Sequence, residues 1–329
     1  MSTPNDTPSP LILFSLPRSG STLAQRILGA HPEIATVAEP WILLPLLYSL
    51  KEKGSYTEYN HQYTNIAIND FCRELPNGKD DYLAAISHFA RELYDKARKG
   101  EERYFLDKTP RYNLVSDEVI KLFPDGKFIF LWRNPLAVAA SIIETWGHGS
   151  WSLYRFKIDL YEGLEKLIDT FTQHQDTVHA VRYEDLSCNP ETEWAAILKY
   201  LELDYNPDLL AQFSNVNLEG QLGDKTGVKQ YKTVSDEPLE KWKSTFSNPL
   251  RKAWCRRYLN WIGQERLSIM GYDLSELLDE LAAIPTIPRR ILSDAALMSF
   301  GAAYCFFEPY ATIDKLKTLP DWRNIHVNR

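Results

Sequence analysis

The chain has 329 residues, is 44% apolar and 25% charged, and carries a formal net charge of −7. These proportions are those of a globular protein. The negative charge excludes broad binding to nucleic acid, so any anion site must be a local concentration of Arg and Lys. Four cysteines stand far apart without a C-x-x-C pair, which predicts neither a zinc site nor a disulfide framework and favours a reducing, cytoplasmic setting.

The two ends of the chain give no sign of a membrane protein. Residues 1–10 are polar and rich in Pro, lack the basic start of a secretory signal, and are predicted to form a disordered tail. The most hydrophobic later stretch, 295–307, is 13 residues long. A helix needs about 20 apolar residues to span a bilayer, so we expect no transmembrane segment here. We expect a buried helix, and contact with an interface or with a membrane surface is the alternative.

The first folded stretch predicts an anion site. An apolar strand at 11–16 leads through a turn at 17–20 into a helix at 22–30. Such a loop collects free backbone N–H groups at the positive end of a helix dipole, which suits a phosphate or sulfate group. Ser19, Ser21 and Thr22 add hydroxyl donors, and Arg18 adds a permanent positive charge.

This loop does not match the common nucleotide P-loop, which ends in Gly-Lys-Ser or Gly-Lys-Thr. Gly20 is followed directly by Ser21 and Thr22, and the cation precedes the glycine at Arg18. The sequence therefore predicts a site for a phosphorylated group that lacks the usual ATP-cleaving lysine.

The remaining chain alternates strands with helices, which predicts an α/β fold of three layers around a parallel sheet. Further strands are expected at 34–37, 104–107, 127–132 and 177–182. Helices are expected at 41–50, 113–123, 136–145, within 146–176, at 190–201 and at 251–270. A single α/β domain at 11–272 would hold a helical insertion at 41–100 and a loop at 219–237. A C-terminal helical extension at 273–329 would pack on the same domain.

Polar or charged loops follow four of these strands. In open α/β sheets ligands sit at the carboxyl ends of the strands, so these loops should meet in space. They are 18–22, 107–109, 133–134 and 183–184.

Five motifs together carry a family resemblance. They are Pro17-Arg-Ser-Gly-Ser-Thr22, His31-Pro-Glu33 with Glu39, Asp107-Lys-Thr-Pro110, Phe130-Leu-Trp-Arg-Asn-Pro135 with Ser141, and Arg182-Tyr-Glu-Asp-Leu186. In order and spacing this set resembles sulfotransferases that use 3′-phosphoadenosine 5′-phosphosulfate (PAPS) and have a P-loop-like fold. It is most similar to the branch of protein-tyrosine sulfotransferases and their bacterial relatives, over residues 11–245.

The resemblance implies a set of nucleotide-binding residues. The loop for the 5′-phosphosulfate falls on Arg18, Ser19, Gly20, Ser21 and Thr22. The clamp for the 3′-phosphate falls on Arg133 and Ser141, and the residue in contact with adenine on Tyr183. A later loop that closes over the nucleotide falls on Lys229, Tyr231, Ser235 and Lys241.

The resemblance also implies the chemistry. The catalytic base of the family is a Glu placed 21 residues after the loop Arg, and Glu39 stands at that spacing. Lys108 matches the catalytic Lys, which contacts the bridging oxygen or a sulfuryl oxygen. The reaction is in-line transfer of a sulfuryl group to an acceptor hydroxyl, without a metal ion.

One position departs from the pattern. Relatives carry an additional Arg four residues after the clamp Ser, where this chain has Thr145, so Lys225 or Lys229 is expected to take over its contact with the 3′-phosphate. Residues that would bind an acceptor peptide are not recognisable in 41–100. We therefore expect a carbohydrate or small-molecule acceptor, and the sequence leaves open whether the chain forms a homodimer.

Two alternatives compete with this interpretation. One is a nucleotide-binding module without catalysis, against which the presence of both Glu39 and Lys108 argues. The other is a kinase-like phosphoryl transferase. The missing lysine of the P-loop and the absence of a metal-binding Asp after a strand argue against it.

Overall fold

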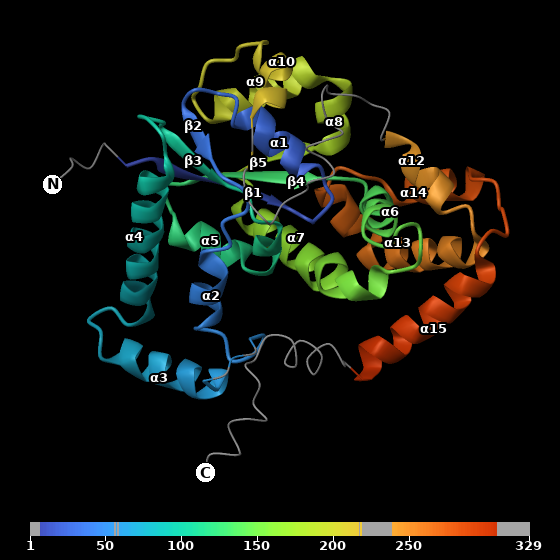
Figure 1. The fold of residues 1–329 in the computed structure, drawn as a ribbon, viewed down its shortest axis with the longest axis horizontal. Coiled ribbons are helices and arrows are strands. Elements are labelled where there is room, and N and C mark those ends of the chain that lie inside the picture. Colours follow the sequence, from blue (N-terminus) through green and yellow to red (C-terminus); the bar gives the residue numbers. More distant parts are fainter. Residues whose placement is uncertain (1–6, 56, 58, 217, 219–238, 308–329) are drawn as a thin grey trace.

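A parallel sheet lies at the centre of the computed structural model, which describes residues 7–55, 57, 59–216, 218 and 239–307. Within these residues the sheet has five strands in the order β2-β3-β1-β4-β5 (Figure 1). Their bounds are β1 Ser9–Ser15, β2 Ile34–Thr36, β3 Tyr104–Asp107, β4 Lys127–Trp132 and β5 His179–Arg182. Every neighbouring pair is parallel, so the carboxyl ends of all five strands share one edge.

Alternation along the strands divides the core in two. In β1, Leu11 and Leu13 belong to one apolar cluster, whereas Ile12 and Phe14 belong to the other. Successive side chains of a strand point to opposite faces, so a strand buried on both sides is apolar at every position. This explains why the sequences of β1 and β4 are continuous hydrophobic runs.

Helices cover both faces of the sheet (Figure 1), which confirms the predicted three-layer α/β fold. One face is covered by α1 Ser21–Leu28, α8 Tyr183–Cys188, α9 Pro190–Tyr200, α10 Leu209–Gln212 and the 3₁₀ turn η4 Phe213–Asn215. The other is covered by α2 Leu43–Tyr48, α4 Lys79–Ala97, α5 Ser116–Leu122, α6 Pro135–Thr145, α7 Leu164–His174, α13 Pro249–Ile269 and α14 Leu274–Ala283. The remaining elements are α3 His61–Arg73, η1 Pro110–Leu114, η2 Leu153–Phe156, η3 Asp159–Gly163, α12 Lys241–Thr245 and α15 Ile291–Phe307.

Two predicted segments, before β1 and after β5, differ from the structure. Strand β1 begins at Ser9, where Ser9 N donates to Arg103 O, so Ser9 and Pro10 belong to the sheet and not to a tail. The segment after β5 is helix α8 and not a loop, because its Glu and Asp residues suit the first turn of a helix. The domain bounds 11–272 and 273–329 remain predictions.

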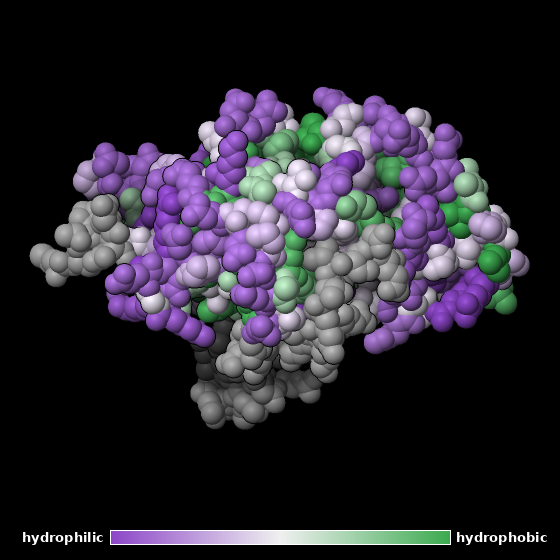
Figure 2. Space-filling view, turned by 90° about the horizontal axis from the view of Figure 1, so that it is seen from above, coloured by the Kyte–Doolittle hydropathy of each residue, from purple (hydrophilic) through white to green (hydrophobic). Residues whose placement is uncertain are grey.

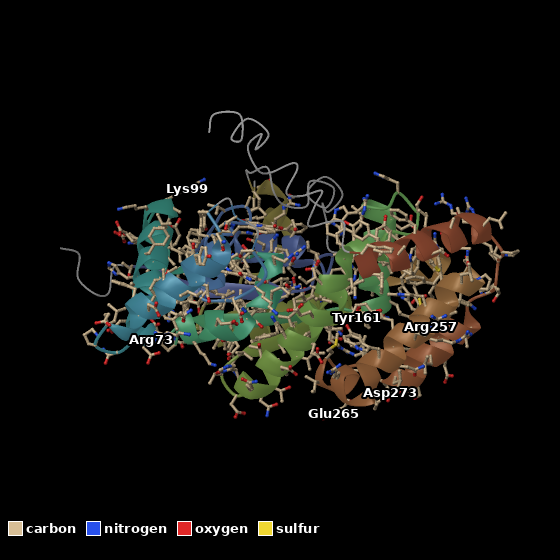
Figure 3. All side chains as sticks on the ribbon, turned by 90° about the horizontal axis from the view of Figure 1, so that it is seen from below. Arg73, Lys99, Tyr161, Arg257, Glu265 and Asp273 are labelled. Carbon is tan, nitrogen blue, oxygen red and sulfur yellow. The ribbon has the colours of Figure 1, made fainter. Side chains whose placement is uncertain are left out.

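The helix expected within 146–176 is α7, which begins at Leu164 after a short π-helical turn, η3. Aromatic rings fix this turn against α13. The ring centre of Tyr161 lies 4.6 Å from that of Trp261 and 5.4 Å from that of Tyr258, and Figure 3 shows Tyr161 between the helices on this side of the molecule.

Helix α15 corrects the prediction of a buried helix at 295–307. Along this helix only Asp294 and Gly301 are buried, whereas Leu292 is 87% exposed and Phe306 is 81% exposed. The segment is apolar on all sides, so its sequence has no polar stripe that would reveal which face meets solvent. The face of the molecule drawn in Figure 2 is mainly hydrophilic, with scattered apolar residues. Among the described residues, none of the helices has the length and hydropathy needed to cross a membrane.

A buried ion pair holds α15 on the domain. Arg251 of α13 donates from Nε to Asp294 Oδ2 at 2.6 Å and from Nη2 to Asp294 Oδ1 at 3.0 Å. Asn248 Nδ2 donates to the same carboxylate at 3.0 Å. The side chains of the pair are 5% and 0% exposed. Two parallel bonds to a planar guanidinium are a strong, directional contact.

We expect Asp294→Ala to destabilise the protein by about 3–5 kcal/mol, because it leaves the charge of Arg251 buried without its partner. Chemical denaturation measures the change in the free energy of unfolding. Asp279→Ala, an exposed acidic residue on α14, is the matched control. A loss under about 1 kcal/mol would contradict the anchoring role of the pair.

A carboxylate is buried at the end of β3. Asp107 is 0% exposed and accepts hydrogen bonds from the hydroxyls of Tyr94 at 2.8 Å, Tyr112 at 2.9 Å and Thr109 at 2.9 Å. Burial raises the pKa of Asp107 from 3.8 to about 6, although the three hydroxyl donors and the charge of Lys108 oppose the shift.

The raised pKa gives stability a definite dependence on pH. Asp107 binds its proton more tightly in the folded chain, so its contribution is fully present below pH 3.8 and is lost as pH rises through about 6. We expect the free energy of unfolding of the wild type, relative to Asp107→Asn, to increase between pH 7 and pH 4 by about 2 kcal/mol. Urea unfolding of both proteins across this range measures the difference. The same pH slope in both would refute it.

Candidate functional site

The loop between β1 and α1 has the backbone shape of an anion-binding turn. Arg18 and Gly20 both have left-handed conformations, with φ of 69° and 91°. Gly20 is the N-cap of α1, and a Cβ atom at this position would clash with the ring of Tyr183. Glycine therefore meets both a conformational and a steric requirement here. The first N–H groups of α1, at Ser21 and Thr22, have no helical acceptor and are available to an anion.

The Arg18 side chain lies along α6, next to the predicted 3′-phosphate clamp. Its Nε donates to Ser141 Oγ at 3.2 Å, and its Nη2 donates to Thr145 Oγ1 at 3.2 Å. Its guanidinium lies 5.6 Å from the centre of the Trp146 ring. A cation from the loop thus reaches the position where relatives carry an additional Arg. Lys225 and Lys229, which were expected there, lie outside the described residues.

Arg133 closes the other side of this loop. It follows β4, donates from Nη1 to Arg18 O at 2.9 Å, and places its guanidinium 4.3 Å from the ring centre of Tyr183. Its side chain is buried, and its Nε has no hydrogen-bond partner within the described part of the chain. A buried cation with a spare donor fits a phosphate group.

Local sequence explains why the chain turns at Arg133. Asn134 Oδ1 caps α6 by accepting from Leu136 N and Ala137 N, and Pro135 occupies the first helical position, where its missing N–H costs nothing. The backbone N–H of Asn134 donates to Glu184 Oε1 at 3.0 Å. This bond ties the ends of β4 and β5 together.

Tyr183 supports Arg133. Its ring is 1% exposed, and the Arg133 guanidinium lies over the face of this ring. Gly20 packs against the edge of the same ring. A direct contact between this ring and adenine stays a prediction.

A second pair of charges lies at the β2 and β3 side of the same edge. Lys108 Nζ donates to Glu39 Oε1 at 2.8 Å, and the two side chains are 2% and 12% exposed. Lys108 follows β3 directly, and Glu39 lies between β2 and α2. Trp41 Nε1 donates to Glu39 Oε2 at 3.1 Å, so both oxygens of this carboxylate are engaged.

The strand order determines where the Glu39–Lys108 pair and the Arg133–Tyr183 pair lie along the sheet edge. Because β1 lies between β3 and β4, its loop stands between the Glu39–Lys108 pair and the Arg133–Tyr183 pair. Hydrogen bonds and ring contacts link the loop before α1 to Arg133–Asn134, and link both of these to Tyr183–Glu184. These are three of the four segments that were predicted to meet. In the fourth segment, 107–109, Lys108 contacts Glu39.

The other predicted residues are distributed as follows. Ser19, Ser21 and Thr22 are buried in the loop and the first turn of α1. Lys241 is exposed at the start of α12, which is held beside α6 by a bond from Thr245 Oγ1 to Glu144 Oε1 at 2.8 Å. Lys229, Tyr231 and Ser235 lie outside the described residues.

Two contacts were not predicted from the sequence. Thr145 and Trp146 meet Arg18, and Trp41 holds Glu39. A Trp two residues after a Glu follows no recognised motif, and the sequence does not reveal the left-handed φ of 59° at Trp41. In the described ranges, no group of three His, Cys, Asp or Glu side chains is arranged to hold a metal ion.

Comparisons with known proteins place this site in a family. The family model described as "Sulfotransferase family" matches residues 10–207. The nodulation protein NoeE of Sinorhizobium fredii is 38% identical over 145 residues, which are 43% of this chain and 33% of that protein. The protein-tyrosine sulfotransferase of Drosophila melanogaster is 26% identical over 243 residues, 71% of this chain and 47% of that protein. The chain thus spans about a third and about half of these relatives.

Two sulfotransferase domains of solved structure are also similar. The domain of the curacin biosynthetic pathway is 21% identical with a TM-score of 0.48, covering 72% of this chain and 91% of that domain. The domain of the Synechococcus PCC 7002 olefin synthase is 23% identical with a TM-score of 0.47, covering 74% and 90%.

The family model covers more than half of the chain, from the second residue of β1 to the segment after α9. Its range includes the loop, Glu39, Lys108, the clamp residues and Tyr183. The chain therefore belongs to the sulfotransferase family.

Proposed function

We propose that this sulfotransferase takes its sulfuryl group from PAPS and transfers it to a hydroxyl of a carbohydrate or other small molecule, with Glu39 as the base. The observation that carries the proposal is the arrangement at one sheet edge. A loop whose backbone shape suits an anion lies between a buried Arg with a spare donor and the ion pair of buried Lys108 with partly buried Glu39.

The nucleotide would be held by the loop and its two arginines. Arg133 supplies a buried guanidinium. Ser141 of α6 supplies a hydroxyl, and Arg18, bonded to it from the loop, supplies a second guanidinium. The N–H groups at the start of α1 would bind the phosphosulfate end. When bound, PAPS supplies a sulfur atom open to attack and a bisphosphate leaving group.

Glu39 and Lys108 have complementary tasks in the transfer. The acceptor oxygen forms a bond to sulfur while the bond between sulfur and the bridging phosphate oxygen breaks, and that electron pair leaves with adenosine 3′,5′-bisphosphate. Glu39 takes the proton of the acceptor hydroxyl. Lys108, fixed beside it and 2% exposed, stabilises the negative charge on the bridging and sulfuryl oxygens, and it acts strongly because little water screens it.

Charge pairing near α2 favours an acceptor without many negative charges. Lys51 pairs with Glu118 at 2.6 Å, and Arg111 pairs with Asp159 at 3.2 Å. These cations are neutralised by their own partners and do not form a positive surface for an acidic acceptor. Relatives named as protein-tyrosine sulfotransferases make a tyrosine hydroxyl the competing acceptor.

Transfer of labelled sulfate from PAPS tests the proposal. The purified protein is incubated with metabolite and glycan extracts of the host and, separately, with a tyrosine-containing peptide, and the products are identified by mass spectrometry. We expect label in carbohydrates or small molecules. Label in the peptide alone would overturn the acceptor class, and tighter binding of ATP–magnesium than of PAPS would overturn the donor.

We predict that Glu39→Ala lowers the transfer rate by about 10²–10⁴-fold, the usual effect of losing a positioned base. Lys108→Ala should lower it by about 10²–10³-fold, the usual effect of losing a group that stabilises charge in the transition state. Binding of adenosine 3′,5′-bisphosphate, measured by calorimetry, should persist in both. Glu33→Ala, an exposed Glu in the same segment, is the control. If wild type binds the nucleotide but sulfates nothing, the chain is a binding module.

Arg133→Ala should act on binding instead. Loss of a charge-assisted contact of about 1.5–3 kcal/mol weakens affinity for adenosine 3′,5′-bisphosphate by about 10- to 100-fold. Arg103→Ala removes an Arg that is 43% exposed and serves as the matched control. Unchanged affinity in Arg133→Ala would contradict the clamp.

A further inference from the structure

A ring of hydrogen bonds connects the end of β3 to Glu39 through Thr109, Trp41 and Lys108. Thr109 Oγ1 donates to Asp107 Oδ1 at 2.9 Å and accepts from Trp41 N at 3.3 Å. Trp41 Nε1 donates to Glu39 Oε2 at 3.1 Å, and Glu39 Oε1 accepts from Lys108 Nζ at 2.8 Å. Lys108 is covalently joined to Asp107, so the ring returns to its start.

Asp107 determines the direction of these bonds. A carboxylate only accepts hydrogen bonds, so each hydroxyl that faces it must donate its one hydrogen to it. The oxygens of Thr109 and Tyr112 are then left as acceptors for backbone N–H groups. Tyr112 Oη accepts from Leu43 N at 3.4 Å, in parallel with the bond from Trp41 N to Thr109. Both ends of the segment 41–43 are thus held by the same buried carboxylate.

The backbone at Trp41 needs such support. Its φ of 59° is left-handed, a conformation that costs a bulky residue about 1–3 kcal/mol and persists only where the surroundings impose it. Pro40, which precedes Trp41, has no N–H to contribute. The bond to Thr109 is therefore a specific restraint on a strained residue that directly holds the proposed base.

We propose that Asp107 and Thr109 are positioning residues that fix Trp41 in its left-handed conformation and thereby aim the Glu39 carboxylate. The indole holds Oε2, and Oε1 faces Lys108. This inference rests on the proposed role of Glu39 as the base. Asp107 and Thr109 do not touch the reacting atoms and act only through Trp41 and Tyr112.

The test has a readout independent of activity. The indole N–H resonance of Trp41, assigned in ¹⁵N-labelled protein by its loss in Trp41→Phe, reports the bond to Glu39. We expect Thr109→Val to move this resonance and speed its exchange with solvent, and Thr109→Ser to retain both wild-type values. Tyr94→Phe is the control, because Tyr94 donates to Asp107 but has no recorded bond to the segment 41–43.

Kinetics give the second readout, with labelled PAPS and the host extract as the acceptor pool. Thr109→Val should lower the maximal transfer rate by about tenfold or more, with the KM for PAPS within about twofold of wild type, because the base is misplaced while the nucleotide site is intact. Thr109→Ser should recover most of the rate, and Tyr94→Phe should keep it.

Three results would overturn the proposal. They are an unmoved Trp41 resonance in Thr109→Val, a wild-type rate in that variant, or a joint loss of rate and of affinity for adenosine 3′,5′-bisphosphate. The last would show a merely structural role. If wild type itself transfers no sulfate, the proposed function fails, and the resonance still decides whether Thr109 holds Trp41.

Discussion

The burial of Lys108 is the constraint on which this site depends. An ammonium group with 2% exposure is costly unless an opposite charge and further donors or acceptors compensate for the lost water. Glu39 is that opposite charge, and it comes from a separate segment that must cross from β2 to the end of β3. The strained turn at Trp41 and the buried carboxylate of Asp107 are both consequences of bringing that segment into place.

The nucleotide side of the site meets a different requirement. Here the cations lie close to one another, since Arg133 donates to the backbone of Arg18 and both guanidinium groups rest on aromatic rings. Aromatic faces stabilise a cation without neutralising it, unlike a carboxylate. The ring of Tyr183 thus supports Arg133 without cancelling its charge, whereas the charge of Lys108 is balanced by Glu39.

The sequence was sufficient to predict the layers, all five strands and the set of residues at the strand ends. Hydrophobic runs and strand-to-helix turns are local signals, and β4 with its Arg133-Asn-Pro135 turn is an example of both. The exposure of α15 could not be predicted, because a helix that is apolar on all sides carries no information on its orientation. Two hydrogen bonds, from Arg18 to Thr145 and from Trp41 to Glu39, depend on side-chain directions that the spacing of residues does not encode.

The contact between Gly20 and Tyr183 has a consequence for how this loop can vary. The two positions lie in different strand–helix units, yet the space for a side chain at one is filled by the ring at the other. A larger residue at position 20 would require a smaller one at 183, and that exchange would remove the ring on which the guanidinium of Arg133 rests. Three positions spread over about half of the chain must therefore change together, so relatives should differ at all of them or at none.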